Sequence, residues 1–255
     1  MTETVSVVIP ALNEGKNIKS CLIKLLNQYE KPLEIIVVDN GSVDNTNITV
    51  QNLKKKFKGS GIELRIFYYP FGNQLNARAF GIKKSRGTII GSLDAEANPN
   101  NKWVKKIKEY FKDPKIVGIG GKSSFRNKGI VLNFFYGISY YLRFVINTYC
   151  LGGGNSAFRK STFIYVGGYN GLEKLREEKK IKYVKDDFYL SKKLGEVGKL
   201  KFCPDLKVSL LYRIRNKNDK KYKYKYSIKE VLTRVFLEIY YDYQINKYFK
   251  DKKKE

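Results

Sequence analysis

Histidine is absent from the 255-residue sequence, and only one tryptophan, one methionine and three cysteines occur. Without histidine, Ser-His and Cys-His nucleophile pairs and imidazole-based zinc sites are excluded, so base chemistry falls to Asp, Glu, Lys or Tyr. The cysteines, Cys21, Cys150 and Cys203, are widely spaced and form no CxxC pair. This pattern favours reduced, structural thiols in a cytosolic protein.

Acidic residues are scarce: 24 Asp and Glu stand against 50 Lys and Arg, which gives a formal net charge of +26. Such a charge attracts polyanions, namely nucleotides, nucleic acid or anionic lipid headgroups, without choosing among them. The first residues lack the pattern of a signal peptide. The longest apolar stretch, 130–149, is interrupted by Asn133, Arg143 and Asn147, so we expect no transmembrane helix there.

The first half of the chain alternates between strand and helix patterns. Strands separated by helices predict a mostly parallel α/β sheet, in which ligands gather at the carboxyl ends of the strands. The expected strands are 5–9 (ended by Pro10), 34–38, 62–69 and 87–93, and the expected helices are 17–29, 44–57 and 74–85. Polar clusters at 10–14, 39–44 and 94–96 follow three of these strands.

The second half is less regular. It contains a glycine cluster, "LGGGNSAFRKS", and an acidic segment, "KDDFYLSKKL", before a basic C-terminal extension at 213–255. The expected elements are a helix at 102–111, strands near 116–119, 200–203 and 206–211, and an amphipathic helix at 227–249. We therefore predict one α/β domain over 1–212, with helices flanking a central sheet, followed by the basic helical extension.

Asp94 and Glu96 follow the fourth expected strand in "GSLDAEANP". In an extended chain, residues two apart point the same way, so both carboxylates would lie on one side. Two carboxylates at an open strand end supply half of a Mg²⁺ or Mn²⁺ site, which substrate phosphates and water complete. The alternative is a solvated acidic turn.

Three further motifs carry polar side chains next to expected helices. Glu14 in "PALNEGKNI" and Asp39 in "VVDNGSVDNT" could hold a nucleoside, with Asp39 accepting a base N–H; both segments also suit plain helix-capping turns. Ser42 is expected to be an N-cap. Arg78 is either a bridge to base, ribose or diphosphate, or a surface arginine. For Trp103, helix packing is favoured over sugar stacking.

Five segments resemble, in order and spacing, the family 2 glycosyltransferases over roughly 4–212: "SVVIPALNEGKNI", "EIIVVDNGSVDNT", "ARAFGIKKSRGTIIGSLDAEANP", "LGGGNSAFRKSTFIYVGGYN" and "DDFYLSKKLGEVGKLKF". The resemblance implies the A-type glycosyltransferase fold, a nucleotide-diphospho-sugar donor and inverting transfer. It places the nucleoside at Pro10, Ala11, Glu14, Asp39, Arg78 and Asp94. It places Mg²⁺ or Mn²⁺ on Asp94 and Glu96, and the catalytic base at Asp187.

The same resemblance puts the sugar or acceptor near Gly153, Gly154, Asn155 and Asp186. Two positions depart from the family pattern: Glu96 stands where the metal motif usually ends in Asp, and Asp186 stands where Glu usually precedes the base. The longer side chain of Glu96 still supplies an oxygen ligand. The sequence leaves open whether Glu96 contacts the metal ion directly or indirectly. The Q-x-x-R-W motif of processive polymer synthases is missing, which favours transfer of a single sugar.

The expected enzyme is thus a non-processive glycosyltransferase of the hexosyltransferase type. Its donor is expected to carry UDP, with GDP as the main competitor, and its acceptor to be lipid-linked or a glycan. Alternatives are a catalytically silent scaffold that binds nucleotide or lipid, and a basic nucleic-acid-binding protein. No recognition motif supports specific nucleic-acid binding.

The lysines near the C-terminal helix suit peripheral attachment to an anionic membrane surface at its cytoplasmic face, or a solvated basic surface. The sequence leaves the sugar, the acceptor and the oligomeric state open.

Overall fold

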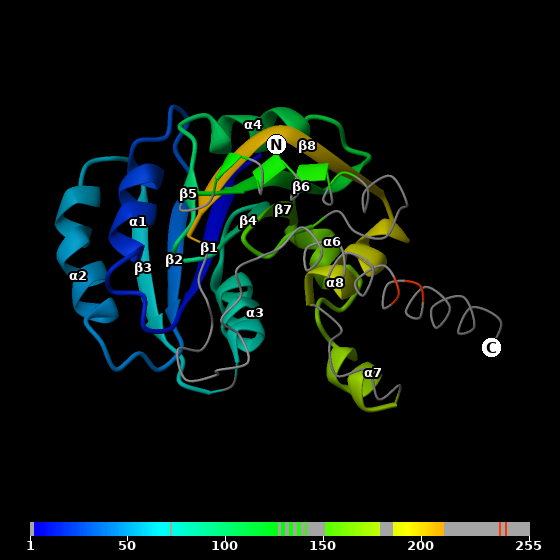
Figure 1. Cartoon of the computed structure of the whole chain (residues 1–255), viewed down its shortest axis with the longest axis horizontal. Coiled ribbons are helices and arrows are strands. Elements are labelled where there is room, and N and C mark those ends of the chain that lie inside the picture. Colours follow the sequence, from blue (N-terminus) through cyan, green and yellow to red (C-terminus); the bar gives the residue numbers. More distant parts are fainter. Residues whose placement is uncertain are drawn as a thin grey trace.

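In the computed structural model, the described residues are 3–71, 73–126, 129–130, 133–134, 137–138, 141, 151–178, 186–211, 240 and 243. Within them the strands form one eight-stranded sheet in the order β3-β2-β1-β4-β7-β6-β8-β5 (Figure 1). The chain has the α/β architecture that the sequence predicts, with one central sheet and flanking helices.

Four neighbouring strands are parallel: β3 (Glu63–Tyr68), β2 (Glu34–Asp39), β1 (Val5–Ala11) and β4 (Ile89–Leu93). β1, β2 and β4 are buried along their whole length, which explains their unbroken β-branched composition. The expectation that Pro10 ends the first strand is wrong. Pro10 pairs with Val38, but the register with β4 stops at Val8, so the missing N–H of Pro10 costs little on that side.

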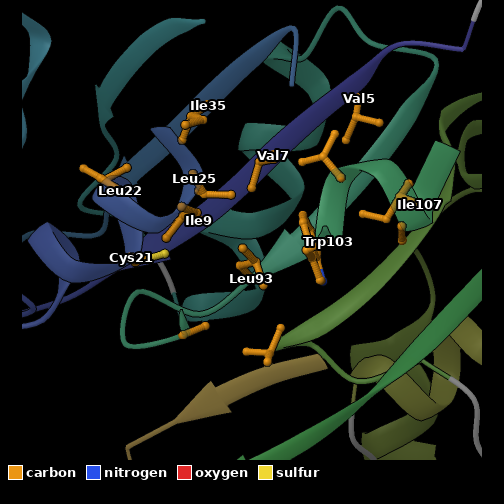
Figure 2. Packing of buried hydrophobic residues seen from close by; sticks show 14 of the residues in the cluster. Val5, Val7, Ile9, Cys21, Leu22, Leu25, Ile35, Leu93, Trp103 and Ile107 are labelled. Carbon is orange, nitrogen blue, oxygen red and sulfur yellow. The ribbon is translucent and has the colours of Figure 1, made fainter. Parts of the chain in front are cut away.

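Helices cover both faces of this sheet. Side chains of α1 (Ile18–Leu26), α2 (Thr46–Phe57) and α4 (Trp103–Tyr110) pack with alternate residues of β1 in the largest apolar cluster. Figure 2 shows the contributions of α1, α4 and β1. α3 (Gln74–Lys84), α6 (Lys160–Tyr165) and α8 (Asp186–Gly195) pack against the other face, and α7 (Leu172–Glu178) contributes to a smaller cluster. Trp103 is fully buried, so the packing interpretation of this residue is confirmed.

The second half of the sheet is mixed. It contains β5 (Asn98–Pro99), β6 (Ile116–Phe125), β7 (Asn155–Arg159) and β8 (Lys199–Leu210). β7 runs antiparallel to both β4 and β6. The two strands expected near 200–203 and 206–211 are one strand, which shifts register against β6 between Gly121 and Lys122. Because β7 is reversed, its first residue lies at the same edge of the sheet as the last residues of β4.

A charge cluster closes the opposite, amino edge of the sheet. Glu34, at the start of β2, is fully buried and accepts hydrogen bonds from Ser6 Oγ (2.8 Å) and Arg65 Nη1 (2.6 Å). The backbone N–H of Arg86 also donates to Glu34, at 2.6 Å. Burial alone would raise the pKa of Glu34, but these partners outweigh burial and lower it.

Two predicted segments lie wholly or largely outside the described residues. In 130–149, only Ile130, Asn133, Phe134, Gly137, Ile138 and Tyr141 are described. The helix predicted at 227–249 is described only at Tyr240 and Tyr243, so the extension at 213–255 remains a prediction. Among the described residues, no helix has both the length and the hydrophobicity to cross a bilayer.

Candidate functional site

Three predicted polar clusters meet at the carboxyl edge of the parallel strands. Ala11, the last residue of β1, is paired with Asp39, the last residue of β2. On the other side of β1, Val8 is paired with Ser92, so the same register carries Pro10 level with Asp94. This edge therefore brings together the residues that the sequence assigns to a nucleoside and to a metal.

Two loops at this edge are joined by a set of hydrogen bonds. The backbone N–H groups of Asn13, Glu14 and Gly15 donate to Ser42 Oγ (2.9 Å), Thr46 Oγ1 (2.8 Å) and Asp44 Oδ2 (3.0 Å). In return, Val43 N–H donates to Asn13 Oδ1, at 2.9 Å. Asn13 adopts a left-handed conformation (φ 55°), which asparagine tolerates better than most residues. The two loops therefore form one rigid wall.

Glu14 and Asp39 are both buried in this wall. Glu14 Oε2 accepts a hydrogen bond from Asn17 Nδ2 (3.1 Å), and Asp39 Oδ1 accepts one from Ser42 N–H (2.9 Å). The prediction that Ser42 caps the following helix is wrong. α2 begins at Thr46, whose N–H donates to Asp44 Oδ1, while Ser42 Oγ is used to hold the neighbouring loop.

Asp94 and Glu96 lie on a turn, not on an extended strand as the sequence suggested. The N–H of Ala97 donates to the carbonyl of Asp94 at 3.0 Å, which closes the turn. The Cys21 thiol donates to the Asp94 carbonyl at 3.9 Å. Burial is the main cause that raises the pKa of the Cys21 thiol far above its ordinary value, and Glu96 and Asp94 add to that rise. The two acidic residues thus share one turn, and the extended geometry expected for them is wrong.

Arg78 is buried, with 3 % of its side chain exposed, so the surface-arginine interpretation is wrong. Its guanidinium donates to Asp94 Oδ1 (3.0 Å), to the Gly153 carbonyl (2.6 Å) and to Ser92 Oγ. Burial opposes the charged form of Arg78, yet Asp94 and other nearby acidic groups outweigh it and raise the pKa of the guanidinium. Protein groups therefore occupy both terminal nitrogens of Arg78, while its buried Nε has no hydrogen-bond partner within the described residues.

The glycine loop before β7 links Asp94 to Asp187. A Cβ atom on Gly154 would lie 2.5 Å from Asp94 Oδ2, and one on Gly153 would lie 3.2 Å from Arg78 Nη2. On its other side, Gly153 N–H points to Asp187 Oδ2 at 3.5 Å. Asp187 lies in the first turn of α8, where the helix dipole favours a carboxylate. Only glycine permits backbone to approach both sides this closely.

Asn155 does not belong to the acceptor site that the sequence predicted. Its side chain is buried and all of its contacts are internal: Oδ1 accepts from Trp103 Nε1 (2.8 Å). Its Nδ2 donates to the carbonyls of Leu206 (2.9 Å) and Lys122 (3.1 Å). Asn155 thus fixes the start of β7 to α4, β6 and β8, and holds the glycine loop in place indirectly.

Sequence reasoning missed two residues of the site. Gln74 Nε2 donates to Asp94 Oδ1 at 3.2 Å, and Gln74 precedes Arg78 by one helical turn, a spacing that placed both on one face of the expected helix. Tyr169 lies close to Arg78, Asp186 and Asp187. Burial is the main cause that raises the pKa of its hydroxyl, and the two aspartates raise it further, against Arg78.

The acidic residues suit a divalent cation that is held partly by substrate, and they do not form a closed protein site. Within the described part of the chain, no group of three or more His, Cys, Asp or Glu side chains could hold a metal. Mg²⁺ is ordinarily bound by one or two carboxylates with substrate phosphates and water. Asp94 is 26 % exposed, and its Oδ2 lies so close to the Gly154 backbone that a Cβ atom there would come within 2.5 Å. These donors fit such an ion.

The family model described as glycosyl transferase family 2 matches residues 6–167. Two relatives are the glycosyltransferase AglE of Haloferax volcanii and a transferase of Methanococcus voltae named dolichyl N-acetyl-alpha-D-glucosaminyl phosphate 3-beta-D-2,3-diacetamido-2,3-dideoxy-beta-D-glucuronosyltransferase. AglE is 33 % identical over 130 residues, which cover 49 % of this chain and 42 % of AglE. The second is 32 % identical over 124 residues, which cover 46 % of this chain and 38 % of the relative.

A similar solved structure is the mannosyltransferase PcManGT of Pyrobaculum calidifontis in complex with GDP-Man and Mn²⁺. It aligns with a TM-score of 0.65 at 19 % identity, over 85 % of this chain and 59 % of that one. At this identity the likeness concerns the fold. The chain spans less than half the length of the two relatives, and the matched region ends at residue 167, before Asp186 and Asp187.

Proposed function

The chain belongs to glycosyl transferase family 2, and we propose that it moves one sugar from a nucleotide-diphospho-sugar to a lipid-linked or glycan acceptor, with inversion. The carrying observation is that the Gly153–Gly154 backbone lies against both Asp94 and Asp187. Asp94 is suited to hold the cation that neutralises the departing diphosphate, and Asp187 is suited to the incoming acceptor. A single displacement between them would invert the anomeric carbon.

On the donor side, the joined loops that carry Glu14 and Asp39 would hold the nucleoside, together with Pro10 and Ala11. Asp39 is buried at the end of β2, where its carboxylate can accept a base N–H. Mg²⁺ or Mn²⁺ held by Asp94 and Glu96 would supply positive charge to the diphosphate as it leaves. Glu96 extends further than the usual aspartate and still offers an oxygen ligand.

On the acceptor side, Asp187 would take the proton of the acceptor hydroxyl as that oxygen attacks the sugar. Asp186 and the Gly153–Gly154 backbone would border the sugar. If the acceptor is a lipid phosphate, it is already ionised, and Asp187 orients it instead. The name of the Methanococcus voltae relative, a dolichyl phosphate sugar transferase, supports a lipid-linked acceptor.

The donor is tested by melting temperature, since a ligand that binds only the folded state stabilises it. The melting temperature is measured with UDP-sugars and with GDP-sugars, each with and without Mn²⁺. We expect a UDP-sugar to raise the melting temperature more than a GDP-sugar, which is the type of ligand present in the PcManGT structure. Asp94→Ala should abolish the Mn²⁺-dependent part of the rise. Glu177→Gln, an exposed change on α7, is the matched control. An Asp94→Ala protein with the full Mn²⁺ effect would refute the metal assignment.

The role of Asp187 is tested by Asp187→Asn. Loss of a general base typically lowers kcat by about 10²–10⁴-fold, and we expect this with little change in the donor KM. Unchanged transfer to a hydroxyl acceptor would show that Asp187 is not the base. If Asp187→Asn loses transfer to hydroxyl acceptors but keeps transfer to a lipid phosphate, the phosphate needs no base, and Asp187 has only the orienting role there.

We also propose that the protein works while attached to an anionic membrane surface, at the cytoplasmic face. In the 130–149 segment, Asn133 hydrogen-bonds both backbone groups of Phe125, at 2.7 and 3.0 Å, so its polar side faces the protein. Ile130 (88 % exposed) and Phe134 (63 % exposed), with Ile138 and Tyr141, are exposed at helical spacing. The net charge of +26 complements anionic headgroups.

Membrane attachment is tested by co-sedimentation with vesicles of phosphatidylcholine alone and with anionic phosphatidylglycerol added. We expect binding only to the anionic vesicles, and weaker binding for Ile130→Asp. Ile164→Asp, at an exposed position of α6, is the control. Equal sedimentation of the wild-type protein with and without vesicles would contradict attachment.

A further inference from the structure

One oxygen of Asp94 takes two side-chain donors, and the other faces the glycine loop. Oδ1 accepts hydrogen bonds from Arg78 Nη2 at 3.0 Å and from Gln74 Nε2 at 3.2 Å. Oδ2 borders Gly154, where a Cβ atom would come within 2.5 Å. The carboxylate is therefore anchored through one oxygen, and its plane cannot rotate without breaking two hydrogen bonds.

Arg78 uses both terminal nitrogens on protein partners, whereas its buried Nε has no hydrogen-bond partner within the described residues. Its guanidinium is 3 % exposed and already contacts Asp94, the Gly153 carbonyl and Ser92. Ser92 Oγ also donates to the Gly153 carbonyl, at 2.9 Å. Arg78 thus joins the end of β4 to the glycine loop.

We infer that Arg78 and Gln74 are positioning residues, which fix Asp94 so that Oδ2 is presented to the cation and the donor diphosphate. The inference rests on the proposed role of Asp94 as a metal ligand. Removal of a side chain that orients a ligating carboxylate typically lowers metal affinity or activity by about 10–100-fold. Gln74 supplies this orientation from the exposed side of Asp94, and Arg78 supplies it from the buried side.

Gln74→Ala is the main test, because Gln74 is exposed and its loss opens no cavity. Calorimetry measures UDP and GDP binding without metal, and Mn²⁺ binding in the presence of the better nucleotide. We expect Gln74→Ala to weaken Mn²⁺ binding about 10-fold or more while metal-free nucleotide binding stays at the wild-type value. Asn76→Ala, an exposed change on the same helix, should leave both values unchanged.

Arg78→Lys extends the test, since lysine keeps the charge but cannot hold Asp94 and Gly153 together. If it folds, as judged by its melting temperature, we expect a larger loss of Mn²⁺ affinity than for Gln74→Ala. Weaker metal-free nucleotide binding in either variant, with normal Mn²⁺ affinity, would make these residues nucleotide contacts and overturn the inference. Wild-type protein that binds nucleotide without any Mn²⁺ response would refute the metal assignment, and the positioning role with it.

Discussion

The close approach of Gly154 to Asp94 gives a quantitative prediction. A methyl group at 154 would lie 2.5 Å from Asp94 Oδ2, whereas carbon and oxygen normally meet at roughly 3.3–3.6 Å. Gly154→Ala must therefore move the carboxylate or the loop by about 1 Å. Arg78 and Gln74 hold the carboxylate from the other side, so the shift cannot be absorbed by a free rotation.

A misplacement of about 1 Å in a catalytic site costs on the order of 100-fold in rate. This corresponds to roughly 2.7 kcal/mol of lost transition-state stabilisation. The assay is the kcat of donor hydrolysis and transfer, with the nucleotide-sugar that raises the melting temperature most. Folding should change little, because Gly154 does not adopt a left-handed conformation that an alanine would disfavour.

Two further glycines provide a graded control series. At Gly153 the nearest atom to a Cβ is Arg78 Nη2 at 3.2 Å, so Gly153→Ala should cost less than Gly154→Ala. At Gly129 no atom lies within 4 Å, and Gly129→Ala should match the wild-type protein. A folded Gly154→Ala variant with wild-type kcat, or one no worse than Gly129→Ala, would refute the reasoning from steric contact.

Two other predictions concern stability. Asn155→Ala leaves the Trp103 N–H and two backbone carbonyls without their partner in the interior. At about 1–3 kcal/mol per unsatisfied group, the variant should lose at least ~2 kcal/mol of unfolding free energy in urea titrations. A loss under ~0.5 kcal/mol would contradict the buried network. The lowered pKa of Glu34 contributes stability that is present above its ordinary value of 4.5 and is lost as the pH falls below it. Glu34→Gln should therefore flatten the acid side of the pH–stability curve, and an unchanged slope would assign the acid transition to other carboxylates.

The parallel half of the sheet could be predicted because its signals are local. Buried strands of Val and Ile alternate with amphipathic helices, and the polar residues that follow them must meet at one edge. Within that half, the errors at Ser42 and Arg78 arose where a side chain found a partner far along the chain. Ser42 looked like a cap, but Asn13, 29 residues away, uses its hydroxyl.

The second half could not be predicted to the same extent, because β7 is short and its partners are remote in sequence. Nothing local in "NSAFR" indicates a strand placed between β4 and β6. The family resemblance put Asn155 near the sugar or acceptor, yet tertiary contacts bury its side chain. Arg78 was recognised as a site residue, but the sequence carries no sign that Ser92 and Gly153 enclose it.

The reversed direction of β7 has an evolutionary consequence. β6 ends, and β7 begins, at the same edge of the sheet as Asp94, so the connection between them departs from and returns to that edge. Because both of its ends lie there, the length of the connection does not set the register of β6 against β7. We expect changes in its length and sequence to accumulate beside Asp94, while the charge cluster around Glu34 at the far edge is not affected.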